Sequence, residues 1–224
     1  MARISANALF HFTDKPEKLA SILTNDFWPH YHKEKIHLRK DVNYELLIPM
    51  VSFCDIPLSQ IDQHVETYGH YGIGMSKEWG MGKGLNPILY LNAGSILAGD
   101  LHTAFKATFE KEGVEALVKS QRFIKEYRDG DKCYYDEREW RFVPDGEIFQ
   151  MAPKPKKLAE LNERAQSHRL SFTPTDIRYI VTKHRAEVPA LIEDIFRLKG
   201  NRSREEQLLV ISKIISCEDI FEDF

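Results

Sequence analysis

Residues 133–143 constrain the fold more than any other stretch, because aromatic, β-branched and charged residues alternate along them. A charged turn comes before this stretch and a Pro-Asp-Gly sequence follows it. Aromatic and β-branched residues bounded by turn residues are typical of a β-strand. We therefore predict a strand here, around which the rest of the chain is organised.

Alternating residues of a strand point to opposite faces, so Trp140 and Phe142 share one face and Glu137, Glu139 and Arg141 share the other. If Trp140 faces the core, two carboxylates and a guanidinium project together. Carboxylates about 7 Å apart on one face repel each other, which costs stability unless a cation or a ligand compensates. The pattern fits a functional site, and it also fits an edge strand whose solvated carboxylates pair with Arg141.

Composition indicates a globular protein with no general affinity for polyanions. The chain has 224 residues, 42% of them hydrophobic, so we expect residues 1–224 to form a single domain. A formal charge of −3 gives no overall attraction to nucleic acid or anionic lipid, so such a partner would need a local patch. Three widely spaced cysteines and the lack of a long apolar run predict a cytoplasmic protein without a membrane span.

Hydrophobic periodicity predicts an α+β fold. Strands are expected at residues 8–13, 48–55, 86–91 and 177–182. Helices are expected at residues 17–23, 59–68, 97–128 with a break near Gly113, 158–166 and 186–198. The basic, proline-rich residues 152–157 are expected to form a connector inside the domain.

Two stretches invite a functional interpretation that their spacing does not support. Residues 27–37 have no steady period, and we expect an ordered loop. Its histidines lack cysteine or carboxylate partners at metal-ligand spacing, so no metal site is assigned. Residues 69–84 contain six glycines, which indicate close backbone approach or unusual dihedral angles, but neither standard phosphate-binding loop fits them.

Four motifs, at residues 9–13, 51–58, 71–80 and 137–141, resemble the AbiGi family of bacterial phage-defence proteins. The similarity extends over most of the chain. The order of the motifs, from a strand with a His-x-Thr sequence to a late strand with a Glu-x-Glu sequence, also resembles the His-Tyr-Glu arrangement of the ADP-ribosyltransferase superfamily.

The superfamily resemblance implies a split β-sheet core with flanking helices that grips NAD, as substrate, in a central cleft. It implies that His11 hydrogen-bonds the nicotinamide ribose, that Thr13 assists, and that Glu139 is the catalytic carboxylate. The resemblance does not decide which aromatic ring stacks on nicotinamide. Tyr71 is the first choice, and the alternatives are Phe53 and Tyr68.

The cleavage of NAD requires a carboxylate at the reacting ribose. Breaking the glycosidic bond builds oxocarbenium charge on the ribose, which an ionised carboxylate such as Glu139 stabilises. The resemblance further implies that Glu137 polarises the acceptor nucleophile and that Arg141 holds Glu139 ionised or binds a diphosphate.

Three functional hypotheses follow. The first is an NAD-dependent mono-ADP-ribosyltransferase toxin of a phage-defence system, with nucleic acid as an acceptor. The second is a non-catalytic antitoxin or regulator that binds a partner toxin, which the AbiGi resemblance implies. The third is a metal nuclease using Asp131 and Glu139, in which Arg141 is a poor substitute for a lysine that transfers protons.

Overall fold

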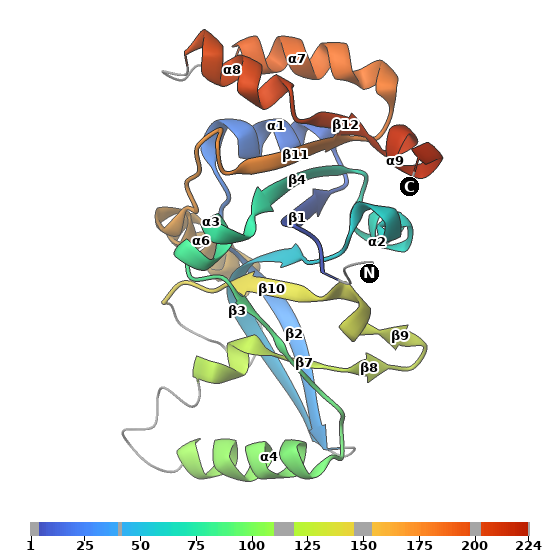
Figure 1. Cartoon of the computed structure of the whole chain (residues 1–224). Coiled ribbons are helices and arrows are strands. Elements are labelled where there is room, and N and C mark those ends of the chain that lie inside the picture. The colour runs from blue at the N-terminus through green and yellow to red at the C-terminus, as the bar shows by residue number, and fades with distance from the viewer. Residues whose placement is uncertain (1–4, 40–41, 110–118, 146–153, 198–202, 224) are drawn as a thin grey trace. The chain divides into compact units, whose positions relative to one another are not determined.

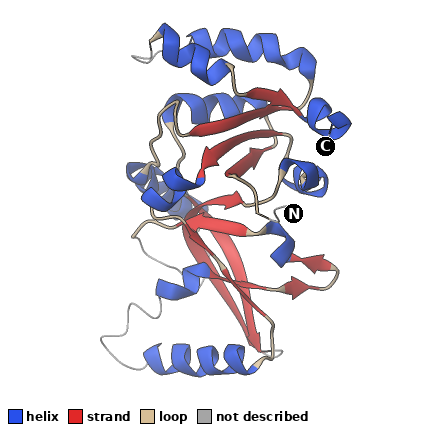
Figure 2. Ribbon diagram, in the orientation of Figure 1, coloured by secondary structure: helices blue, strands red, loops and turns tan. Residues whose placement is uncertain are grey.

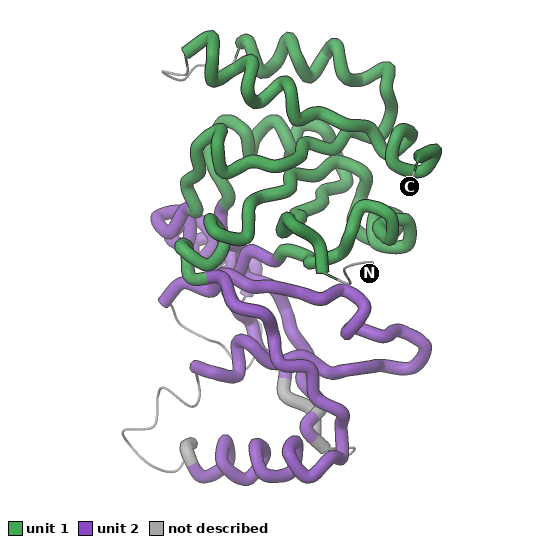
Figure 3. The backbone as a smooth tube through the Cα atoms, in the orientation of Figure 1, with its two compact units in different colours: residues 1–27, 53–84, 170–224 green, residues 28–52, 85–169 purple. Residues whose placement is uncertain are grey.

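The computed structural model describes residues 5–39, 42–109, 119–145, 154–197 and 203–223 (Figure 1). The chain forms two compact units, each assembled from separate segments (Figure 3). Unit 1 comprises residues 1–27, 53–84 and 170–224, and unit 2 comprises residues 28–52 and 85–169. That residues 1–224 act as a single domain stays a prediction.

Unit 1 is a small sheet with helices around it. Its strands are β1 (Ala8–Thr13), β4 (Tyr71–Ser76), β11 (Ile177–Thr182) and β12 (Ile214–Ser216). Its helices are α1 (Pro16–Asn25), α2 (Asp62–Tyr68), α3 (Lys77–Gly82), α7 (Val188–Arg197), α8 (Arg204–Ile211) and α9 (Cys217–Asp223). Two 3-10 turns complete it, η1 (Leu58–Gln60) and η5 (Arg185–Glu187).

The strands of unit 1 lie in the order β12, β11, β4, β1. Strand β11 is parallel to β12 and antiparallel to β4, which is antiparallel to β1. Phe10 and Phe12 of β1 lie in an apolar cluster with Val65 of α2 and with Cys217 and Ile220 of α9. Burial of these side chains holds both helices against one face of the sheet.

Two glycines of β4 allow aromatic rings to lie against the strand. A Cβ atom at Gly72 would lie 2.6 Å from the Phe12 ring, and one at Gly74 would lie 2.6 Å from the Phe10 ring. Both rings are buried. The close approach expected from the glycine-rich stretch is therefore confirmed at these two positions.

Unit 2 is built on a long β-hairpin (Figure 2). Its strands are β2 (His30–Arg39), β3 (Val42–Cys54, of which the last two residues belong to unit 1), β5 (Asn86–Pro87), β6 (Leu89–Leu91), β7 (Ile124–Glu126), β8 (Arg128–Asp129), β9 (Lys132–Cys133) and β10 (Glu139–Phe142). Its helices and 3-10 turns are α4 (Ile96–Phe109), η2 (Gln121–Phe123), η3 (Tyr134–Glu137), α6 (Pro155–Ala165) and η4 (Gln166–His168).

The core of unit 2 forms where the hairpin meets α4. Strands β2 and β3 are antiparallel, β10 lies between β3 and β5, and β6 is parallel to β7. Phe105 of α4 lies in one apolar cluster with Ile36 of β2, Ile48 of β3, Leu91 of β6 and Ile124 of β7. Units 1 and 2 together confirm the predicted α+β class, with both parallel and antiparallel strand pairs.

Several local predictions were wrong. Residues 30–39 form β2 instead of a loop, because pairing with β3 imposes the strand although the sequence lacks a period. Residues 124–126 form β7 rather than the end of a helix, and the predicted break at Gly113 lies outside the described residues. Helix α6 begins at Pro155, inside the predicted 152–157 connector, because proline fits the first helical position.

Among the described residues, none of the helices combines the length and the apolar character needed to cross a membrane.

We predict that Gly74→Ala destabilises the protein by about 1–3 kcal/mol, because the new methyl group would lie 2.6 Å from the Phe10 ring and so forces a buried side chain to shift. The matched control is Gly82→Ala, where an added Cβ has no neighbour within 4 Å. Urea denaturation checks both variants. Equal midpoints for the two variants would contradict the packing argument.

Candidate functional site

The residues predicted to form a site divide between the two units. Glu137, Glu139 and Arg141 belong to unit 2. The others belong to unit 1: His11, Thr13, Phe53, Tyr68 and Tyr71. Each group makes extensive contacts within its own unit.

The stretch 133–143 is not one continuous strand. Strand β9 ends at Cys133, the 3-10 turn η3 follows, and β10 starts at Glu139. Arg138, between η3 and β10, has a left-handed backbone conformation with φ 43°. The prediction of a single strand was wrong because this turn interrupts the extended backbone, which the alternation of residue types does not reveal.

Glu139 and Arg141 share one face of β10 as predicted, but Trp140 does not lie on the core side. Glu139 and Arg141 are the buried side of the strand, with exposures of 6% and 0%, whereas Trp140 and Phe142 are only half-buried. A charged side chain is tolerated in such a position only when it is paired and hydrogen-bonded. The contacts of Glu139 and Arg141 meet that condition.

Glu139 is bound on both carboxylate oxygens. Arg141 Nε donates to Oε1 at 2.5 Å and its Nη2 donates to Oε2 at 3.1 Å, which is a bidentate pair. Ser52 Oγ of β3 donates to Oε1 at 2.6 Å, and Lys125 Nζ of β7 donates to Oε2 at 3.0 Å. Tyr90 Oη accepts the backbone N–H of Glu139 at 2.8 Å. The carboxylate is therefore fixed from three strands.

The remaining charges close the network. Arg141 also pairs with Glu34 of β2 at 3.0 Å and donates to the carbonyl of Arg122 at 3.0 Å. Lys125 bridges Glu139 and Glu137, which lies 2.9 Å from its Nζ. We call this set the unit 2 ion cluster: Glu34, Lys125, Glu137, Glu139 and Arg141. Two carboxylates do come together as predicted, and Lys125 supplies the compensating cation.

The ion cluster sets the charge state of its members. Burial alone would raise the pKa of the Glu139 carboxyl, but the charge and hydrogen bonds of Arg141, with Lys125 and Ser52, lower that pKa to about 2. Burial likewise opposes the charge of Lys125, but the carboxylates around it keep the pKa of Lys125 above its ordinary value. Glu139 and Lys125 are therefore both ionised at neutral pH. The arrangement can hold β10 rigidly, with little freedom for its carboxylates to bind another molecule.

In unit 1, His11 of β1 lies in an aromatic cluster. Its ring centroid is 5.5 Å from that of Phe27 and 5.6 Å from that of Phe53. Phe53 is buried and also packs against Trp79, at 5.7 Å. The structure thus brings two predicted residues together, His11 and Phe53, with Phe53 in a packing role.

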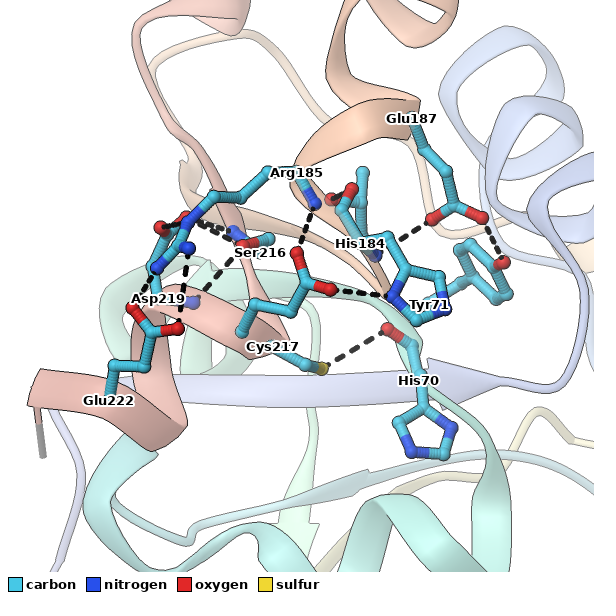
Figure 4. Close-up of polar contacts among 11 residues, drawn as sticks. His70, Tyr71, His184, Arg185, Glu187, Ser216, Cys217, Asp219 and Glu222 are labelled. Carbon is cyan, nitrogen blue, oxygen red and sulfur yellow. Dashed lines mark hydrogen bonds and ion pairs between the residues drawn. The ribbon is translucent and has the colours of Figure 1, made fainter.

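The other predicted site residues of unit 1, Thr13, Tyr68 and Tyr71, make contacts within the folded unit. Thr13 and Tyr71 are register partners on β1 and β4, and Thr13 Oγ1 donates to the carbonyl of Lys15. Tyr71 Oη donates to Glu187 at 2.7 Å (Figure 4), and burial, with this bond, raises the pKa of Tyr71 to about 12. Tyr68, at the end of α2, is partly exposed and lies 4.6 Å from the His64 ring.

Figure 4 shows that Glu187 belongs to a polar network that sequence reasoning missed. Glu187 accepts the backbone N–H of His184, and His184 Nδ1 lies 2.8 Å from Glu218 of α9. Arg185 is hydrogen-bonded to Asp219 and Glu222 of the same helix. Glu187 caps η5 from three residues after His184, a spacing that can be seen in the sequence. The contacts with α9 join residues more than 30 positions apart, which no local pattern indicates.

The sequence analysis missed two residues of the ion cluster, Glu34 and Lys125, because no local sequence pattern marks them as site residues. Lys125 lies in a stretch whose apolar spacing resembles a helix, and Glu34 lies in the stretch predicted as a loop. The described residues contain no group of three or more His, Cys, Asp and Glu side chains that could hold a metal ion. Asp131, which the nuclease hypothesis pairs with Glu139, is exposed beside β9, whereas Glu139 is paired with Arg141.

We predict that Glu139→Gln destabilises the protein by about 3–5 kcal/mol at neutral pH, because it leaves the buried Arg141 without its main counter-charge. Denaturation by urea checks this, with Glu160→Gln on the exposed face of α6 as control. The folded pKa of Glu139, about 2, lies below the ordinary value of 4.5. Stabilisation by this carboxylate is therefore complete above the ordinary pKa and is lost as pH falls toward 2, so wild type and variant should converge over that range.

Comparisons with known proteins identify the family. A family model described as "Putative abortive phage resistance protein AbiGi, antitoxin" matches residues 25–183. The "Abortive phage resistance protein AbiGi" of Lactococcus lactis subsp. cremoris is 31% identical over 247 aligned residues, which cover 88% of this chain and 99% of that protein. No solved structure matches, and the transferase-like split-sheet core stays a prediction. The chain belongs to the AbiGi family of abortive phage resistance proteins.

Proposed function

We propose that this protein is a non-catalytic antitoxin-type regulator of abortive phage resistance that acts by binding a partner toxin. The observation that carries the proposal is the state of the two predicted catalytic carboxylates. Glu137 and Glu139 are buried and engaged with Lys125 and Arg141. The description of the matching family as an antitoxin agrees with this proposal.

Catalysis would require these carboxylates to contact a substrate. Glu139 is 6% exposed and both of its oxygens already accept hydrogen bonds. Releasing it would leave Glu34 as the remaining carboxylate of the buried Arg141, and the loss of one counter-charge from a buried cation is unfavourable. A cluster of this kind supports a rigid fold, and rigidity suits a protein that acts through its folded surface.

Co-expression with the product of a neighbouring gene that is toxic when expressed alone tests the proposal. We expect a complex that survives size-exclusion chromatography and restores growth of toxin-expressing cells. The variants His11→Gln and Tyr71→Phe, which alter the residues predicted to bind nicotinamide, should retain both properties because binding needs no such site. Their folding is checked by circular dichroism. Absence of both complex and growth rescue with the wild-type protein would overturn the proposal.

An NAD-dependent mono-ADP-ribosyltransferase, with NAD as substrate and nucleic acid as acceptor, is the second candidate. The observation that favours it is the low pKa of Glu139, because the transferase mechanism requires an ionised carboxylate. The same Arg141 contacts that lower this pKa also occupy the carboxylate, so we rank the transferase second.

Incubation with labelled NAD, nucleic acid and cell extract separates the two candidates. Under the antitoxin proposal we expect no label transfer above that of the heat-denatured protein. Transfer by wild type and by the control Glu160→Gln, but not by His11→Gln, would replace the antitoxin proposal with the transferase.

A further inference from the structure

Helix α6 and strand β2 lie side by side in unit 2. The backbone N–H of Tyr31 donates to Oδ1 of Asn162 at 2.8 Å, which attaches the middle of the helix to the start of the strand. After the helix, the guanidinium of Arg169 lies 4.6 Å from the ring centroid of Trp28. Two segments far apart in the sequence are thereby combined into one surface.

This surface is basic in an acidic protein. Residues 28–39 and 154–169 contain eight Lys and Arg residues against three Asp and Glu residues, an excess of five positive charges in a chain of net charge −3. One of the three acids, Glu34, is directed inward to Arg141 at 3.0 Å. Among the side chains of these segments that the structure describes, seven exposed cations stand against two exposed acids, Glu160 and Glu163, so the positive excess at the surface is also five.

We call the exposed cations of the two segments the basic face: Lys33, Lys35, Lys154, Lys156, Lys157, Arg164 and Arg169. Two of them have weak or solvent-exposed partners, since Lys33 pairs with Glu45 at 2.8 Å and Lys157 lies 4.0 Å from Glu160. Within the part of the chain that the structure describes, the remaining lysines and Arg164 form no ion pair.

Stability does not explain the three lysines at the start of α6. The first turn of a helix favours acidic side chains because the helix dipole is positive there. This helix has no acidic residue in its first turn, and Lys154 caps it without a side-chain hydrogen bond. Lys154, Lys156 and Lys157 thus oppose the dipole, which favours an explanation in terms of a partner.

We propose that the basic face binds nucleic acid through its phosphate backbone, independently of toxin binding. A helix of 11 residues spans about 16 Å, so the cations at its two ends reach several successive phosphates. Trp28 supplies an aromatic ring beside one of these cations, Arg169, and aromatic rings next to cations are typical of proteins that bind single strands. Because the contacts are to phosphates, affinity should fall steeply with salt and depend little on sequence.

Fluorescence anisotropy with a labelled 20-nucleotide RNA strand, and with a DNA duplex of equal length, tests this between 50 and 200 mM NaCl. The test variant carries Lys154→Glu, Lys156→Glu and Lys157→Glu. Glutamate in the first turn favours the helix, so we expect this variant to fold. The matched control makes the same change of charge at exposed lysines outside the basic face: Lys15, Lys106 and Lys183.

We expect the test variant to bind at least tenfold more weakly than wild type. The slope of log affinity against log salt concentration should be shallower, by an amount equal to the loss of about two to three phosphate contacts. The control should stay within about twofold of wild type. Three results would overturn the proposal: no binding of either probe at 50 mM NaCl, equal weakening in test and control variants, or competition by a polyglutamate peptide as strong as that by unlabelled RNA. The last would assign the face to an acidic protein. Growth rescue by the test variant shows that toxin binding is separate.

Discussion

Unit 2 depends on a guanidinium that has no contact with solvent. Arg141 is 0% exposed, and a charge in that position is stable only with full electrostatic and hydrogen-bond compensation. Glu139, Glu34 and the carbonyl of Arg122 provide it from β10, β2 and η2. Glu34 and Arg122 lie on elements other than that of Arg141, so moving β2 or η2 would remove part of the compensation of a buried charge.

The same pairing explains why Glu137 and Glu139 tolerate each other. Lys125 lies between them and Lys132 adds a second cation to Glu137 at 3.0 Å. The pair of carboxylates that the sequence presents is therefore paired with cations within unit 2. Abortive phage resistance is a property of the family, and a binding role agrees better with this network than catalysis does.

Sequence patterns predicted correctly those strands whose own residues favour an extended conformation. The bounds of β1 and β11 match the predicted residues 8–13 and 177–182, because both are short apolar runs between turn residues. Strand β2 was missed because its extended conformation depends on pairing with β3 rather than on its own residues. Of the site, Arg141 was expected beside Glu139, but burial of the pair depends on Glu34 and Lys125, whose positions only the folded chain determines.

The interleaved order of the segments has a consequence for biosynthesis. Both segments of unit 2 have been translated once residue 169 has been added, whereas unit 1 still lacks residues 170–224. Those residues supply β11 and β12, so on the ribosome β4 keeps an unpaired edge until β11 emerges. An open strand edge is a site of aggregation, and a chain interrupted late in translation would therefore be a substrate for chaperones or proteases rather than a shorter functional protein.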